Sequence, residues 1–364
     1  MKIKDITSYL EELTPLNYAE SFDNVGLLIG DYQTKVTGVL VTLDTLENIV
    51  EEAIEKKCNL IVSFHPIIFS GLKKINGNSY VERVVLKAIK NDIAIYSMHT
   101  ALDNSFEGVS AKICEVLGLQ NKKVLIPQQN TIKKLTTYVP TSALEKVRSQ
   151  LFNAGAGDIG NYSNCSFTTA GNGTFKGNSD SNPTIGEQNS LHTEAEFLLS
   201  VTFEKHKESG VLSALFNSHP YEEVAYEVTS LHNINQKIGM GMIGDLPQDV
   251  SELDFLKTLK TTMNAGGIRH SKLLNKPIKR VAVLGGAGSF AIKNALQEKA
   301  DIYITADIKY HEFYQAENQL IIADIGHYES EQFTKNLLVD QLTKKFHNFA
   351  IILSDKNTNP IHYL

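Results

Sequence analysis

Hydrophobic positions in the first third of the chain alternate between short apolar runs and stretches with helical spacing. The apolar runs predict strands at 36–44, 59–64 and 93–98. Apolar residues at helical spacing predict helices at 46–57, 81–91 and 109–118. Strands rich in Val and Ile that alternate with helices are typical of a mostly parallel sheet covered by helices.

The pattern changes near Pro127. Strands are predicted at 134–140, 195–205 and 223–231, and helices at 143–155 and 208–217. Between them, 155–190 is rich in Gly, Asn and Ser, which favours a flexible linker. Within it, two strand-like runs flank Asn172-Gly173, which predicts a hairpin instead. The segment therefore reads as an α+β insert domain over 128–240.

The alternating pattern returns after Gly241. Strands are predicted at 279–286, 301–305 and 320–326, and helices at 254–263, 290–299, 308–318 and 328–346. This half resembles the first in length and rhythm. We therefore expect one discontinuous α/β domain, residues 1–127 and 241–364, made of two similar halves and interrupted by the insert.

Composition and charge narrow the class of protein. A length of 364 residues suggests two or three domains. Lys and Arg total 35 against 41 Asp and Glu, a net charge of −6, which excludes a broadly basic nucleic-acid binder. A Lys-rich stretch at 272–280 leaves a local basic groove as a weaker alternative.

Three features bear on the compartment. Cys58, Cys114 and Cys165 are far apart and odd in number, which disfavours a disulfide framework. The N-terminus predicts an amphipathic helix with Ile3, Ile6, Leu10 and Leu13 on one face, not a signal peptide. No run of 18 apolar residues is present, so we expect no membrane span and a cytoplasmic location.

Four potential metal ligands follow predicted strands. His65 follows 59–64, Asp103 follows 93–98, and His327 follows 320–326. Glu331 lies four residues after His327, on the same face of a helix that begins there. Sites in open α/β sheets form beyond the C-terminal ends of strands. Imidazole and carboxylate ligands together suit Zn, Mn or Fe. Any one of these His could instead be a buried structural residue, but their equivalent places favour a site.

Several segments resemble a known family. These are 20–30 (ESFDNVGLLIG), 63–71 (SFHPIIFSG), 97–104 (SMHTALDN), 303–313 (YITADIKYHEF) and 322–331 (IADIGHYESE). They are similar to the GTP cyclohydrolase 1 type 2 family, also called NIF-three-like proteins. In the insert, 157–167, 171–175 and 218–228 resemble the P-II/CutA-like domain of longer bacterial members.

The resemblance implies two divalent metal ions per subunit, with zinc the expected metal, and a toroidal homohexamer whose central cavity the insert caps. His65, Asp103, His327 and Glu331 carry over as metal ligands, with Glu331 as the expected bridge. The family usually has a second His where this chain has Phe64. We therefore expect a weakened second metal site, completed by water or by a neighbour such as His99.

Three other side chains each have two interpretations. His99 either holds Asp103 in place or transfers protons, and His311 is either a surface residue or a general acid/base facing the metals. Asp23 is expected to cap or turn the chain, with the site rim as the alternative.

Two further motifs leave alternatives open. Residues 286–291 fit G-x-G-x-x-A with Asp307 about 20 residues later, the outline of a dinucleotide fingerprint. We favour an anion-holding loop beside the metals, with Ser289. Residues 219–223 (HPYEE) are expected to be a structural turn, with a second metal site as the weaker alternative.

Three functions follow. The first is a metal-dependent hydrolase in which activated water attacks a small molecule, with GTP ring opening at C8 as the reaction that the family name suggests. His311 or His99 would move the proton. The second is a hexameric, metal-loaded regulatory or scaffold protein without turnover. The third and weakest is nucleic-acid binding inside the ring.

Overall fold

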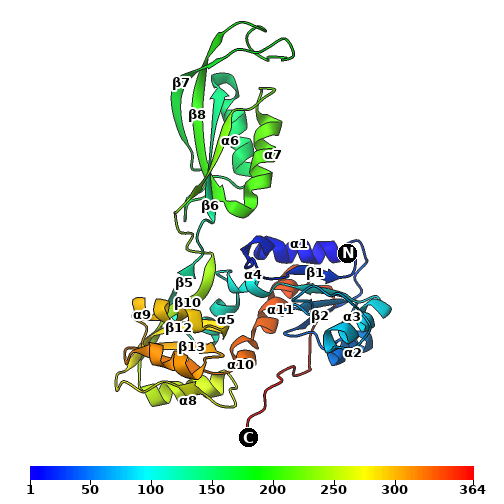
Figure 1. Ribbon diagram of the computed structural model, residues 1–364, viewed down its shortest axis with the longest axis vertical. Coiled ribbons are helices and arrows are strands. Elements are labelled where there is room, and N and C mark those ends of the chain that lie inside the picture. Colours follow the sequence, from blue (N-terminus) through cyan, green and yellow to red (C-terminus); the bar gives the residue numbers. More distant parts are fainter. The chain divides into compact units, whose positions relative to one another are not determined.

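The computed structural model describes residues 1–364, which form two compact units (Figure 1). One unit combines Met1–Pro127 with Gln236–Leu364, and the other is Gln128–Asn235. No helix is both long and apolar enough to cross a bilayer.

The discontinuous unit contains two sheets. The first has the strand order β1-β4-β3-β2-β15, in which only β1 is antiparallel to its neighbour. Its strands are β1 (Gly26–Ile29), β2 (Val39–Thr42), β3 (Leu60–Ser63), β4 (Ala94–Ser97) and β15 (Ile351–Leu353). Its helices are α1 (Ile3–Leu13), α2 (Glu47–Glu55), α3 (Tyr80–Lys90) and α11 (Thr334–Lys345).

The second sheet has the order β11-β14-β13-β12-β10-β5, with β12, β13 and β14 parallel. Its strands are β5 (Gln120–Pro127), β10 (Gly239–Val250), β11 (Arg269–His270), β12 (Ile278–Ala287), β13 (Ile302–Ala306) and β14 (Ile321–Asp324). The remaining helices of this unit are α4 (His99–Asp103), α5 (Val109–Val116), α8 (Glu252–Thr262), α9 (Ile292–Gln297) and α10 (His327–Glu331).

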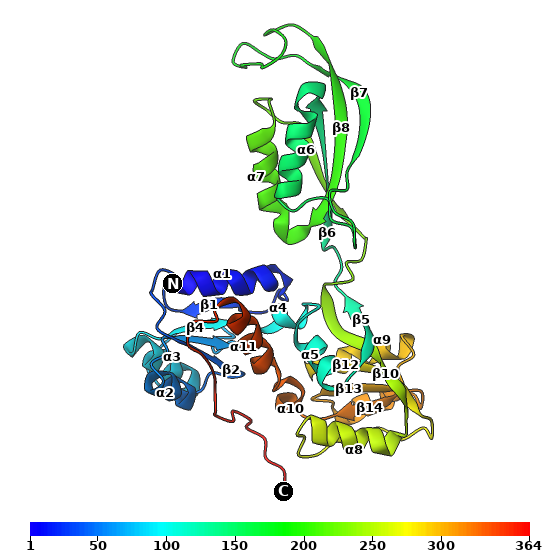
Figure 2. The same cartoon turned by 180° about the vertical axis from the view of Figure 1, so that it is seen from behind.

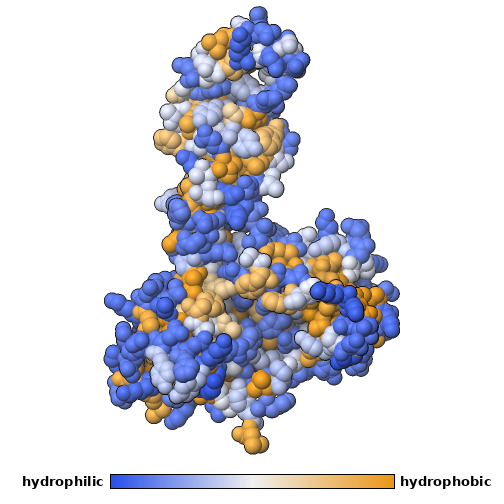
Figure 3. Space-filling model, viewed as in Figure 1, coloured by the Kyte–Doolittle hydropathy of each residue, from blue (hydrophilic) through white to orange (hydrophobic).

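Alternate residues of each parallel strand face different cores. Val39, Val62 and Tyr96 of the first sheet join Val281 and Ile304 of the second in one central apolar cluster. The opposite faces have separate clusters against α2 and α3 and against α9. Burial on both faces explains why these strands read as continuous Val/Ile runs. On the face shown in Figure 3, hydrophobic residues lie in separate patches among hydrophilic ones.

The second unit is an antiparallel sheet with the order β7-β8-β6-β9. Its strands are β6 (Ile132–Pro140), β7 (Phe167–Phe175), β8 (His192–Glu204) and β9 (Tyr226–Leu231). Helices α6 (Leu144–Asn153) and α7 (Glu208–Ser218) pack on one face, as Figure 2 shows. This arrangement is α+β. The likeness to P-II/CutA domains stays a prediction.

Several sequence-based predictions differ from the structure. Asn172-Gly173 is not a hairpin turn, because β7 continues through it. A Cβ at Gly173 would lie 2.0 Å from Glu196 Oε2, so glycine is required here by a side chain of the neighbouring strand. Residues 310–316 form a 3-10 helix instead of an α-helix. Leu13 is exposed, although Ile3, Ile6 and Leu10 are buried as predicted.

The predicted helix 328–346 is two helices, α10 and α11, separated at Gln332–Phe333. Helix α10 packs on β12 and β13 of the second sheet, whereas α11 packs on β2 and β15 of the first. The chain therefore changes direction between two sheets. Periodicity along the sequence does not encode such a break, because both helices have the same spacing.

Candidate metal centre

Two His side chains of the discontinuous unit are placed by the ends of parallel strands. His65 comes two residues after β3, and the Ser63 hydroxyl donates to its carbonyl oxygen over 2.7 Å. His327 is the first residue of α10, which begins after β14. Gly326, which precedes it, has φ +97°, a conformation that favours glycine. The two strands belong to different sheets, so the site lies where the two halves of this unit meet.

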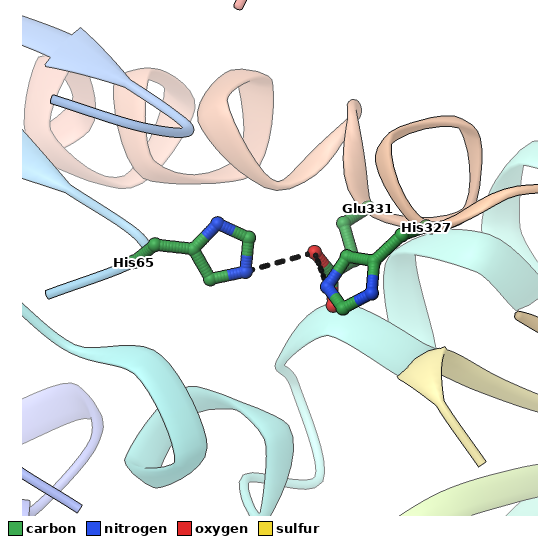
Figure 4. A group of neighbouring side chains, drawn as sticks. All are labelled: His65, His327 and Glu331. Atoms are coloured by element: carbon green, nitrogen blue, oxygen red, sulfur yellow. Dashed lines mark ion pairs between the residues drawn. The ribbon is translucent and has the colours of Figure 1, made fainter. Parts of the chain in front are cut away.

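Glu331 lies between the two imidazoles, as Figure 4 shows. Its Oε2 is 3.1 Å from His65 Nε2 and 3.3 Å from His327 Nε2. The Glu331 side chain is buried, and Oε2 has no hydrogen-bond partner of good geometry. The three ligand atoms all lie within 4.8 Å of one another. A buried carboxylate oxygen without a directed donor, facing two imidazole nitrogens, fits a divalent metal ion.

Two further carboxylates orient the imidazoles. His65 Nδ1 is 2.8 Å from Asp44 Oδ1, and His327 Nδ1 is 2.6 Å from Asp307 Oδ2. Asp44 is itself held by the Thr358 hydroxyl, which donates to Oδ2 over 2.6 Å. A carboxylate on one ring nitrogen leaves the other as the metal-binding atom. Both Nε2 atoms therefore point toward Glu331.

Electrostatics couples these groups in the metal-free chain. Burial alone would lower the pKa of His65, but Glu331 and Asp44 raise it to about 10. Burial alone would also lower the pKa of His327, but Glu331 and Asp307 raise it to about 9. In turn, the two imidazoles overcome the effect of burial and lower the pKa of Glu331 to about 2. Without metal, protons take the place of the cation.

Glycines at the end of β12 make room for Glu331. A Cβ at Gly286 would lie 2.4 Å from Glu331 Oε1, and one at Gly285 would lie 3.3 Å from its Cγ. At Gly288 a Cβ would lie 2.1 Å from the Thr305 hydroxyl oxygen. Close packing thus accounts for the glycines of the G-x-G-x-x-A match. Asp307, the acidic residue of that fingerprint, pairs with His327 instead.

Asp103 is predicted as a ligand but is not among the three atoms that lie together. It is the last residue of α4. Burial and the nearby Glu331 carboxylate raise the pKa of Asp103 well above its ordinary range. The structure thus groups His65, His327 and Glu331 closely and keeps Asp103 within their electrostatic influence.

The rings of His99 and Phe64 are neighbours of the His65 ring. His99 Nδ1 is 2.7 Å from Asp23 Oδ1, so its carboxylate partner is Asp23 and not Asp103. The backbone N–H of Thr100 also donates to Asp23, over 3.0 Å. The Phe64 ring is fully buried, with its centroid 4.8 Å from that of His65 and 5.7 Å from that of His99. An apolar ring therefore fills the space beside His65.

His311 is exposed and stacks with neighbouring tyrosines. Its ring centroid lies 5.1 Å from that of Tyr310 and 6.2 Å from that of Tyr314. It contributes no ligand atom to the His65–His327–Glu331 group. Its role in proton transfer stays a prediction.

Sequence reasoning missed Asp44 and treated Asp307 only as part of a nucleotide fingerprint. Asp44 is the last residue of the predicted strand 36–44, and in the structure it comes two residues after β2, as His65 comes two residues after β3. The rule that placed His65 at a strand end would therefore also have found Asp44. Asp307 has φ +56° directly after β13, a conformation that Asp tolerates better than most residues.

Comparison with known proteins agrees with this architecture. A sequence model of Duf34/NIF3 (NGG1p interacting factor 3) matches residues 1–360. The chain is 38% identical to the GTP cyclohydrolase 1 type 2 homolog of Bacillus subtilis, over 99% of this chain and 98% of that protein. It is 33% identical to the homolog of Staphylococcus aureus strain MSSA476, over the whole of both. Among solved structures, a Bacillus cereus protein related to NIF3 superimposes with a TM-score of 0.86 at 36% identity, over 100% of this chain and 99% of that one.

Proposed function

This chain belongs to the Duf34/NIF3 family, and we propose that it is a divalent-metal-binding protein that acts as a metal-dependent hydrolase. The observation that carries the proposal is the placement of Glu331 Oε2. This buried oxygen faces His65 Nε2 and His327 Nε2 and has no directed hydrogen-bond donor. A cation would satisfy all three atoms at once.

The residues present fit such an ion. His65, His327 and Glu331 would hold it, and Asp103 is the fourth ligand that the resemblance implies. The carboxylates of Asp44 and Asp307 keep both imidazoles in the tautomer that leaves Nε2 free. A bound divalent ion supplies Lewis acidity and lowers the pKa of water near neutrality. Mixed His and carboxylate ligands suit Zn, Mn or Fe, and of these we propose zinc.

The protonation of Asp103 depends on its burial and on the neighbouring Glu331 carboxylate. In the metal-free chain burial, followed by the nearby Glu331 carboxylate, raises the pKa of Asp103 and so favours its protonated form. A cation at the site would favour loss of this proton and make Asp103 available as a ligand. We assign proton transfer during turnover to His99 or to His311, the second of which the resemblance favours.

Metal analysis of freshly purified protein tests the site. We expect bound divalent metal in the natural chain and a large loss in His65→Ala and in His327→Ala. His347→Ala is the matched control, because His347 is exposed and its Nδ1 contacts only the Lys344 carbonyl. Equal metal content in all four proteins would refute the site.

GTP is the substrate to test first, because the relatives carry the name GTP cyclohydrolase 1 type 2 homolog. We expect release of formate from GTP by metal-loaded protein and its loss in His327→Ala. If metal-loaded protein turns over neither GTP nor another phosphorylated nucleotide, the hydrolase proposal fails while the metal site can still stand.

A metal-loaded regulatory or scaffold protein is the second candidate. Phe64 favours it, because an apolar ring occupies the position where the family usually has a second His. A second ion would then have fewer protein ligands. In this case the metal stabilises a homohexamer and no substrate is turned over. Dissociation of the assembly by a chelator, measured by light scattering, together with no turnover, would favour this candidate.

A further inference from the structure

A cavity of about 960 Å³ lies within the unit formed by residues 128–235. Its floor is the face of the β7-β8-β6-β9 sheet opposite to α6 and α7. Tyr138, Leu198 and Thr169 are cross-strand neighbours on this floor. The roof is the segment 177–185, which the turn at 220–222 holds in place. Two hydrogen bonds join them, from the Asn182 backbone N–H to Glu222 Oε2 over 2.7 Å and from the Thr184 hydroxyl to the Pro220 carbonyl over 2.8 Å.

Two glycines leave room on the floor of the cavity, one for open space and one for the Glu196 side chain. Gly171 pairs with Glu196 across the sheet, and a Cβ built on Gly171 would meet no atom within 4 Å. At Gly173, by contrast, a Cβ would collide with Glu196 Oε2 at 2.0 Å. The Glu196 side chain therefore leans over Gly173, beside the open space above Gly171.

Glu196 is the charged group at the base of this cavity. It is only 9% exposed. Its Oε1 accepts a hydrogen bond from the Tyr221 hydroxyl over 2.7 Å, and its Oε2 lies over Gly173. This largely buried carboxylate gains stability from each further donor that reaches Oε2. The cavity is where such a donor would come from.

The walls of the cavity favour a positively charged organic ligand. The rings of Phe175 and Tyr221 lie beside Glu196 with their centroids 5.9 Å apart. Aromatic faces attract ammonium and guanidinium groups, and a nearby carboxylate adds charge attraction. The lining also includes Asp180, Glu222 and Glu223 against the single cation Lys176. This excess of negative charge disfavours phosphorylated ligands.

We propose that this cavity is a binding site for a small organic cation, a primary ammonium or guanidinium group carried on an apolar body. Its N–H groups donate to Glu196 Oε2, its charge lies against the aromatic rings, and its apolar body covers Leu198 and the space above Gly171. This site is independent of the metal centre and of the function proposed for it. It gives the insert a role in sensing an amine.

Calorimetric titration of the full-length protein tests the proposal with matched probes. Phenethylamine supplies an aromatic body with an ammonium group, phenethyl alcohol has the same body without charge, and phenylacetate has the opposite charge. We expect saturable binding of phenethylamine alone. Glu196→Gln should weaken it about ten-fold, the effect of losing one charge-assisted hydrogen bond. Glu227→Gln, an exposed change outside the cavity on β9, should leave it unchanged.

Gly171→Leu is the second variant, because a Cβ there meets no atom within 4 Å and the rest of the side chain would extend into the cavity. It keeps the test valid if Glu196→Gln fails to fold. It should abolish phenethylamine binding while circular dichroism and metal content stay as in the natural chain. Equal binding of the amine and the alcohol would overturn the proposal. So would unchanged amine binding in folded Gly171→Leu, or stronger binding of phenylacetate or GTP than of the amine.

Discussion

Gly286 and Glu331 are in such close contact that a Cβ on the glycine would lie 2.4 Å from Glu331 Oε1. The two residues are 45 positions apart and come from the end of β12 and from α10. Gly286 also has φ +71°, which other residues rarely adopt. The backbone at Gly286 therefore sets both the turn after β12 and the position of the Glu331 carboxylate.

Gly286→Ala should therefore weaken metal binding through Glu331. The added methyl group displaces the carboxylate, and the left-handed conformation costs about 1–3 kcal/mol of unfolding free energy. Metal titration and urea unfolding measure the two effects. Gly71→Ala is the control, since a Cβ there meets nothing within 4 Å. If Gly286→Ala binds metal as tightly as the natural chain, metal binding does not depend on where Gly286 lets the Glu331 carboxylate lie.

Metal affinity should rise with pH across the neutral range. In the metal-free chain the pKa of His65 is about 10 and that of His327 about 9, so both imidazoles carry protons at pH 7. A metal ion must displace these protons, and each displaced proton steepens the dependence by about ten-fold per pH unit. Calorimetry in buffers of different ionisation enthalpy counts the protons released. Affinity that is constant between pH 6 and pH 8 would contradict protonated imidazoles.

Without metal, the pH dependence of stability has the opposite sign. Both imidazoles have a pKa raised above the unfolded value of about 6.5. Their protonation stabilises the folded chain fully below that value, and the stabilisation is lost as the pH rises toward 9–10. Urea unfolding in EDTA at pH 6.5 and at pH 9.5 measures this difference. His65→Ala should show a smaller loss over the same interval than the natural chain.

Asp23→Asn should destabilise the protein by about 1–3 kcal/mol, the cost of losing charge-assisted hydrogen bonds at a buried carboxylate. Burial alone would raise the pKa of Asp23, but His99 and Thr100 lower it to about 2. The stabilisation is therefore present above pH 4 or so and is lost as the pH falls toward about 2. Thermal unfolding at pH 7 and pH 3 measures it, and exposed Asp340→Asn serves as the control. If the natural chain at pH 2 is still more stable than Asp23→Asn by the full amount seen at pH 7, this assignment is wrong.

Phe64→His should increase the amount of divalent metal bound per chain. The Phe64 ring contacts both His65 and His99, so an imidazole there adds a nitrogen ligand beside the site. The metal-free variant should be less stable, because a polar ring replaces a fully buried apolar one. Elemental analysis and chelator-dependent unfolding measure both changes. Phe64→Leu, which changes packing without adding a ligand, should leave the metal content as it is.

Sequence patterning was sufficient to place candidate ligands at the strand ends. Val/Ile runs placed β2, β3, β4, β13 and β14, because strands buried on both faces are continuously apolar. A ligand-type residue directly after such a strand then lies at the sheet's C-terminal edge, which was enough to select His65 and His327. Spacing of four residues placed Glu331 on the face of His327. These inferences rely on local geometry alone.

Only the tertiary structure decided which of these groups meet and what surrounds them. That His65 from one sheet faces His327 from the other depends on how the two sheets share a core, which no local pattern encodes. The partners Asp44 and Asp307, the match of His99 with Asp23, and the contact of Gly286 with Glu331 are likewise long-range. The sequence by itself predicted the buried parallel strands and the candidate ligands at their ends, since both follow from short-range patterns. The fold determined the pairings, since these depend on packing between residues far apart in the chain.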